Sequence, residues 1–173
     1  QMLIAQCRSD LDNCAASILP GFVRQSAIME MAKEAESLVQ VAHRYDGDRV
    51  TFYEEDDIEC SDEDRLKSAV RTARHPNRYC QVLNYQIPNN SDLRAIYLWP
   101  PLTEFIRQVL NVEHLFLSQC PHLALTMKVA YEGDTDGWHY DPNDGVITLV
   151  LQSSDNGGEF EYAPNIRNKT DQN

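Results

Sequence analysis

The residues best suited to chemistry are a histidine and an aspartate two positions apart, His139 and Asp141. In an extended backbone alternate side chains share a face, so the imidazole and the carboxylate point the same way, opposite to Trp138 and Tyr140. An imidazole and a carboxylate are two of the three ligands of the 2-His-1-carboxylate arrangement, which holds Fe(II) and leaves coordination positions open. The pair indicates a metal centre if a further histidine joins that face.

The chain after this pair favours that interpretation over the simpler one, a histidine that is only hydrogen-bonded beside a turn. Asn143–Gly145 predicts a turn, and the β-branched run Val146–Leu151 is typical of a strand buried on both faces. Asp155–Gly158 is a hairpin signal, and Glu159–Tyr162 begins another strand in polar/apolar alternation. A strand–turn–strand array would place the metal pair at its mouth.

Three short stretches carry a resemblance to a known family: Trp138–Asp141 reads WHYD, Leu149–Gln152 reads LVLQ and Gly157–Arg167 reads GGEFEYAPNIR. Together they resemble the core signature of a family of Fe(II)/2-oxoglutarate-dependent oxygenases, which contains the lysine-type free amino-acid halogenases and the related hydroxylases. Weaker similarity lies upstream in Gly21–Val23, Arg74–Pro76 and Tyr97–Pro100. The resemblance touches most of the chain, but only the segment from Trp138 to Arg167 is specific.

The resemblance implies that His139 and Asp141 are the first two iron ligands and that 2-oxoglutarate is the cosubstrate. Halogenating members have a small residue where this chain has Asp141, which frees a position for chloride, so the carboxylate favours a hydroxylase. The implied reaction uses O2 to hydroxylate an unactivated carbon of a free amino acid or similar small molecule. It decarboxylates 2-oxoglutarate to succinate, and we name no catalytic side chain apart from the iron ligands.

One feature of the family is missing from this sequence. The family's second iron-binding histidine, and the arginine that pairs with the far carboxylate of 2-oxoglutarate, lie well downstream of the GGEFEY stretch. The other histidines of this chain all precede His139: His43, His75, His114 and His122. We therefore expect the sequence, which begins with Gln1 and ends at Asn173, to be a fragment of a longer protein; the alternative is an incomplete site.

Two arginines are candidates for binding the substrate. Arg74 and Arg78 belong to the one basic cluster, with Arg71 and His75, and a guanidinium binds a carboxylate through two hydrogen bonds. The simpler interpretation places these cations at a helix C-terminus, where they interact with its dipole. The resemblance supports an arginine in this region, and we expect Arg74 rather than Arg78 to bind the carboxylate of an amino acid.

Three further residues are candidates for the substrate pocket. Glu159 and Glu161 share a face of their strand, so they either support the iron ligands, bind a cationic group of the substrate, or form the solvated side of a hairpin. His122 is a weaker candidate for lining the pocket, since it begins the strand that leads to His139. Asp134 and Asp136 are most simply loop residues.

Composition limits the classes of partner. A net charge of −12 over 173 residues disfavours nucleic acids and anionic membrane surfaces, because both recruit clustered lysine and arginine. The sequence has neither a signal sequence nor an apolar run of about eighteen residues. Its five cysteines include no C-x-x-C pair, which argues against a disulfide framework and a zinc knuckle. We expect a cytoplasmic protein with a small-molecule substrate.

Helical signals dominate the first half of the chain. Residues 1–20 form an opening helix or strand, and apolar spacing predicts an amphipathic helix over about Val23–His43 that stops before Gly47. Ser91 is a predicted helix cap, and Pro100–Pro101 starts the next helix. The acidic stretch Glu54–Asp64 predicts a loop and the first turn of a helix capped by Ser61.

Strand signals dominate the second half. Predicted strands are Val50–Tyr53, Tyr79–Ile87, Leu115–Leu117 and Leu123–Tyr131, followed by the two after the metal pair. This order predicts the α+β class: a double-stranded β-helix (jelly roll, cupin-like) with an N-terminal helical layer. We expect a single domain over 1–173, with the helical layer at about 1–111, strands at about 115–167 and the C-terminal strands lacking. Alternatives are a cupin-type metal enzyme without 2-oxoglutarate, and a non-catalytic binding domain of the same fold.

Overall fold

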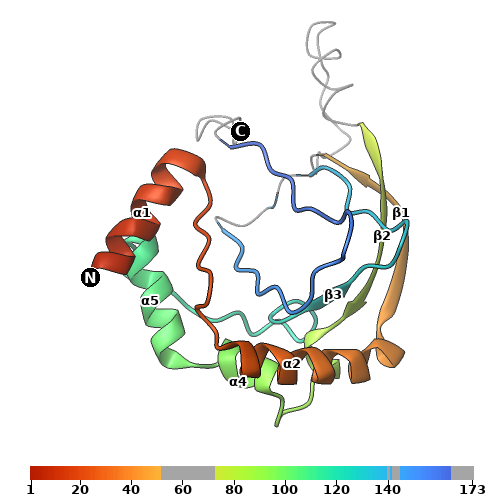
Figure 1. The fold of residues 1–173 in the computed structure, drawn as a ribbon, viewed down its shortest axis with the longest axis horizontal. Helices are drawn as coiled ribbons and strands as arrows, with labels where there is room; N and C mark the ends of the chain where they lie inside the picture. Colours follow the sequence, from red (N-terminus) through yellow and green to blue (C-terminus); the bar gives the residue numbers. More distant parts are fainter. Residues whose placement is uncertain (52–72, 140, 142–144, 165–173) are drawn as a thin grey trace, which may run out of the picture.

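The structure is a computed structural model that describes residues 1–51, 73–139, 141 and 145–164 (Figure 1). Its elements in chain order are α1 (Met2–Cys14), α2 (Gln25–Leu38), the 3-10 helix η1 (Val39–Val41), β1 (His43–Val50), β2 (Arg74–Val82), the 3-10 helix η2 (Asn84–Gln86), α4 (Asp92–Tyr97), α5 (Pro100–Leu110) and β3 (Met127–Val129).

The three strands form one antiparallel sheet in the order β1-β2-β3. β1 pairs with β2 along its whole length, from His43 opposite Gln81 to Val50 opposite Arg74. β3 is shorter and pairs only with the C-terminal end of β2, Cys80–Val82. β2 is therefore the central strand, and its N-terminal end extends past β3.

Apolar side chains of two helices pack against this sheet. The core joins Met31 and Leu38 of α2, Leu93 of α4, Val82 of β2, Met127 of β3 and Ile87, all of them buried. Leu151 packs against the same cluster from the segment that follows His139 and Asp141. In Figure 1, α2 and α4 lie along one end of the sheet, while α1 and α5 form a second pair on the side of the molecule away from the sheet.

Two helix starts follow the sequence prediction, because local side chains decide them. The Ser91 hydroxyl accepts a hydrogen bond from the Arg94 N–H at 3.2 Å and caps α4. Pro100 and Pro101 occupy the first turn of α5, where a missing N–H costs nothing. Both predictions are confirmed. The predicted helix over Val23–His43 is also present, as α2, but it ends earlier, at Leu38.

The strand predictions of the first half need correction. The chain turns through η1 and forms β1, which the sequence did not predict, since six of its eight residues are exposed and show no apolar alternation. Arg74, His75 and Arg78 lie in β2, so their predicted place at a helix C-terminus is wrong. The strand predicted at Tyr79–Ile87 begins at Arg74 and ends at Val82. Two of the three strands thus come from the range expected to be a helical layer.

The second half carries less regular structure than predicted. Within the described ranges, the strands predicted at Leu115–Leu117, Val146–Leu151 and Glu159–Tyr162 are absent, and Leu123–Tyr131 is reduced to β3. These segments find no neighbour to complete a backbone ladder, and apolar pattern alone does not make a strand. The described elements form a mixture of helices and a small antiparallel sheet, and the jelly roll stays a prediction.

Two sequence predictions concern residues outside the described ranges, the acidic stretch Glu54–Asp64 and the last two residues of the strand predicted over Val50–Tyr53. No helix among the described residues has the length and apolar character needed to cross a membrane.

Candidate functional site

The structure brings His139 and Asp141 together. The His139 Nε2 and the Asp141 Oδ1 are 3.3 Å apart, and the histidine side chain is the more buried of the two, 19% exposed against 48%. Because the partners are two residues apart, the pair depends on the local path of the backbone. One face of the pair is open to solvent through the carboxylate, as a site that admits a ligand requires.

A backbone hydrogen bond fixes which nitrogen of His139 is free. Its Nδ1 lies 2.6 Å from the carbonyl oxygen of Gly137. A carbonyl oxygen only accepts hydrogen bonds, so Nδ1 must carry the hydrogen. In the neutral ring the lone pair then lies on Nε2, the nitrogen that faces Asp141.

This geometry fits two ligands of one metal ion. Adjacent ligands at a right angle, each about 2.1 Å from the ion, lie about 3.0 Å from one another. The observed 3.3 Å is close to that value, and the atoms are an imidazole nitrogen and a carboxylate oxygen. The same distance also suits an ion pair when the ring is protonated. Among the described residues, no group of three or more potential ligand side chains forms a complete metal site.

The other histidines make contacts elsewhere. His75 packs against Gly137, two residues before His139. Its Nε2, however, is 3.0 Å from the Thr51 hydroxyl and does not join the pair. His114 stacks on Phe116. His43 stands opposite Gln81, at the far end of the sheet from His75. The structure therefore groups one histidine with Asp141, and not the two that the triad needs.

The two candidate arginines lie on the exposed face of β2, at different distances from the pair. Arg74 is the first residue of the strand and precedes His75, which contacts Gly137. Arg78 lies four residues further along, where its Nε is 3.3 Å from the Asp46 carboxylate of β1. Arg74 is thus at the His139 end of β2, and Arg78 already has a carboxylate partner.

The remaining candidates are not gathered at the pair. His122 contacts the Tyr85 ring edge to face, beyond the C-terminal end of β2. The seven steps from His75 to Val82 span roughly 23 Å at the usual rise of a strand, so His122 and His139 lie at opposite ends of β2. Glu159 and Glu161 are exposed. The rings of Phe160 and Tyr162 stack with their centroids 6.1 Å apart, so these two aromatic side chains lie on one side of the chain, as the alternation of polar and apolar residues predicted.

Two aspartates that were expected to be loop residues have cationic partners. Arg44 donates to both oxygens of Asp134, at 2.8 and 2.6 Å, and Asp136 lies between Arg49 and Lys128. The hydrogen bonds from Arg44, and a further one from the Tyr131 N–H, lower the pKa of Asp134 to about 2. The same pair raises the pKa of Arg44. The only sequence pattern that could have indicated these ion pairs was the alternation of Asp134 and Asp136 just before His139.

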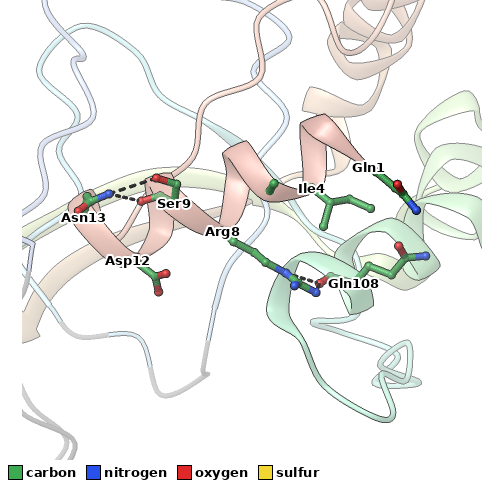
Figure 2. A pocket seen from close by; sticks show the side chains of 8 residues that line it. Gln1, Ile4, Arg8, Ser9, Asp12, Asn13 and Gln108 are labelled. Atoms are coloured by element: carbon green, nitrogen blue, oxygen red, sulfur yellow. Dashed lines mark hydrogen bonds between the residues drawn. The ribbon is translucent and has the colours of Figure 1, made fainter.

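A groove between α1 and α5 lies away from this pair (Figure 2). It has a volume of about 630 Å³ and is lined by Ile4, Arg8, Asp12 and Gln108 among others. Arg8 already donates to the carbonyl oxygen of Gln108, at 3.0 and 2.5 Å. Its guanidinium is therefore used by a backbone carbonyl at the C-terminal end of α5. Chemistry and not size therefore selects the His139 pair as the candidate site.

Comparison with known proteins adds no relative: no family model, curated protein or solved structure matches the chain.

Proposed function

We propose that this protein is an Fe(II)- and 2-oxoglutarate-dependent oxygenase that hydroxylates an unactivated carbon of a free amino acid or a similar small molecule. One observation carries the proposal: the Nε2 of His139 and a carboxylate oxygen of Asp141 are 3.3 Å apart, a distance that two ligands of one ion can have. The resemblance of the segment from Trp138 to Arg167 names the cofactor and the cosubstrate.

Each residue has a part in this proposal. His139 and Asp141 hold the iron, and the resemblance implies a further histidine as the third ligand. The metal, when bound with 2-oxoglutarate, supplies the activation of O2. Asp141 fills the position that chloride takes in the halogenases, so hydroxylation is the expected outcome.

The substrate is bound by charge. Arg74 begins β2, and we propose it as the partner of an amino-acid carboxylate in preference to Arg78, which pairs with Asp46. Glu159 and Glu161 are the candidates for the cationic group of the substrate. The four cysteines among the described residues are free, which agrees with a reducing compartment such as the cytoplasm.

The test is an anaerobic titration of the full natural chain with Fe(II) and then 2-oxoglutarate, followed by visible absorption. We expect the weak charge-transfer band of the iron–2-oxoglutarate chelate, and its loss in His139→Ala and in Asp141→Ala. Glu132→Ala, an exposed carboxylate before the segment, is the matched control and keeps the band. A panel of free amino acids, scored for succinate and for a gain of one oxygen in mass, then identifies the substrate.

Two other outcomes select the alternatives. Iron binding without a band on addition of 2-oxoglutarate supports a cupin-type enzyme that does not use this cosubstrate. No metal binding at all supports a non-catalytic binding domain, in which His139 and Asp141 form only a hydrogen-bonded pair.

A further inference from the structure

The segment that leads into His139 is fixed to the sheet from several sides. We infer that Gly137 and Asn77 are positioning residues, which hold His139 with its Nε2 facing the metal position, and that ion pairs at Asp134 and Asp136 anchor the segment. The inference rests on the proposed metal site. It adds that the orientation of the histidine is set by β1, β2 and β3 before any metal arrives.

Backbone hydrogen bonds give the segment its register. After β3 the chain turns through Gly133, whose φ of +82° lies in the left-handed region that glycine favours. It then rejoins the sheet at Thr135, which exchanges two hydrogen bonds with Arg78, at 2.7 and 3.1 Å. The residues that follow therefore run beside β2, toward its first residue.

Ion pairs hold the residues on both sides of Thr135. Asp134 receives two hydrogen bonds from Arg44 of β1, and its side chain is only 4% exposed. Asp136 pairs with Lys128 of β3 and with Arg49 of β1, the latter at 3.4 Å. A two-pronged arginine–carboxylate pair is among the stronger polar contacts in proteins, although the Arg44 side chain here is 43% exposed. The segment is thus attached to both outer strands as well as to β2.

Gly137 is the residue of this segment that packs most closely against β2. A Cβ at this position would lie 2.7 Å from the Cβ of His75 and 3.0 Å from the carbonyl oxygen of Pro76, which is closer than real contacts allow. Its φ is not in the left-handed region, so glycine is required here for space. Its N–H donates to the Asn77 Oδ1 at 3.3 Å, and Asn77 is only 2% exposed.

The carbonyl of this fixed residue orients His139. Because the N–H of Gly137 is bonded to Asn77 and its Cα is packed on His75, its carbonyl oxygen has a defined place. That oxygen accepts the hydrogen of His139 Nδ1 at 2.6 Å. Ligand histidines are commonly oriented in this way, and loss of the orienting group typically lowers metal affinity by about 10–100-fold.

Two substitutions test the inference in the full natural chain. Gly137→Ala forces the residue away from His75, and Asn77→Ala removes the acceptor of its N–H. Gly47→Ala is the matched control, since its Cβ would meet only the Tyr45 ring, at 3.8 Å. The first readout is the ¹⁵N chemical shifts of the His139 ring in the metal-free protein, which tell the Nδ1–H from the Nε2–H tautomer. The second is the affinity for Co(II), followed by its visible spectrum.

In the unmodified protein and in Gly47→Ala we expect Nδ1 to carry a hydrogen, whether or not Nε2 also carries one toward Asp141. In Gly137→Ala and Asn77→Ala the Nδ1–H form should lose its dominance, and Co(II) affinity should fall about 10–100-fold. Asp136→Asn, at a partly exposed site, is the variant to use if Gly137→Ala does not fold; it should move both readouts in the same direction.

The results separate this inference from the proposed function. If folded Gly137→Ala and Asn77→Ala keep the tautomer and the Co(II) affinity of the unmodified protein, the positioning role is wrong while the metal site stands. Where Gly137→Ala does not fold, the same result in Asp136→Asn has the same meaning. An Nε2–H tautomer in the unmodified protein overturns it as well. If the unmodified protein binds no Co(II) and the substitutions still change the tautomer, the proposed function fails and the positioning role remains.

Discussion

Asp134 is the carboxylate whose protonation the fold alters most clearly among the residues of the candidate site. Its pKa falls to about 2, because Arg44 and the Tyr131 N–H donate to it, whereas a free aspartate titrates near 3.9. The unfolded chain therefore binds this proton at a higher pH than the folded chain. The stability that Asp134 contributes is present above about pH 4 and is lost as the pH falls toward 2.

We expect the melting temperature of the protein to fall between pH 4 and pH 2, and to fall less steeply in Asp134→Asn. A residual slope remains from Glu104, whose pKa is also lowered to about 2, by hydrogen bonds from Arg107 and Gln108. Glu159→Gln, at an exposed position, is the control. The measurement is thermal unfolding by circular dichroism across this pH range. An unchanged slope in Asp134→Asn would contradict the importance of the pair.

Residue-scale prediction from sequence succeeds where the partners are close along the chain. His139 and Asp141 are two residues apart, so the alternation of an extended backbone predicts that their side chains share a face, and their nearest polar atoms are 3.3 Å apart. Asp134 pairs with Arg44, 90 residues away, and Gly137 with Asn77, 60 residues away. No local pattern contains such information, because the sheet alone brings these residues together.

The same contrast holds for the elements. The starts of α4 and α5 are decided by Ser91 and by Pro100–Pro101, within one turn of the helix, so the sequence predicted both. β1 exists because all eight of its residues pair with β2, and an exposed strand shows no apolar alternation. After Asp141, Val146–Leu151 had the pattern of a buried strand and Glu159–Tyr162 that of a half-buried one, but the described residues offer neither a ladder to join.

At this scale a single side chain joins the N-terminal helix to α5. Arg8 of α1 donates to the carbonyl oxygen of Gln108 and to the Asn111 Oδ1, at the end of α5, where carbonyls lack partners within the helix. Arg8 is half-buried, and hydrogen bonds from a charged donor typically contribute about 1.5–3 kcal/mol. We expect Arg8→Met to lower the free energy of unfolding by about 1–2 kcal/mol, allowing for partial exposure.

Urea denaturation measures this loss, and an exposed ion pair supplies the control. Lys33 and Glu30 are 2.9 Å apart on α2, with side chains 66% and 62% exposed. Lys33→Met should cost no more than about 0.5 kcal/mol, since exposed pairs at this spacing contribute little. Equal losses in the two variants would show that Arg8 is only another surface charge.

For the molecule as a whole, the accessible surface is large for its mass. It amounts to 13663 Å² for a chain of 19.8 kDa, whereas a compact monomer of that mass exposes about 8,600 Å². Part of the difference is apolar and lies after Asp141, drawn as the blue trace in Figure 1, where Val146, Ile147, Val150 and Phe160 are exposed. Exposed apolar side chains that are this close along the chain are unusual on a soluble monomer.

We therefore expect the chain of residues 1–173 to bind the dye ANS at neutral pH, with the rise and blue shift of fluorescence that an exposed apolar surface gives. Val150→Lys and Phe160→Lys should each reduce the signal, because each places a charge within this surface. Ile18→Lys is the control, since Ile18 is as exposed, at 78%, but lies far from the segment in sequence. Absence of ANS binding would mean that the segment is covered in solution, and the candidate site would then be more enclosed than the exposed carboxylate of Asp141 indicates.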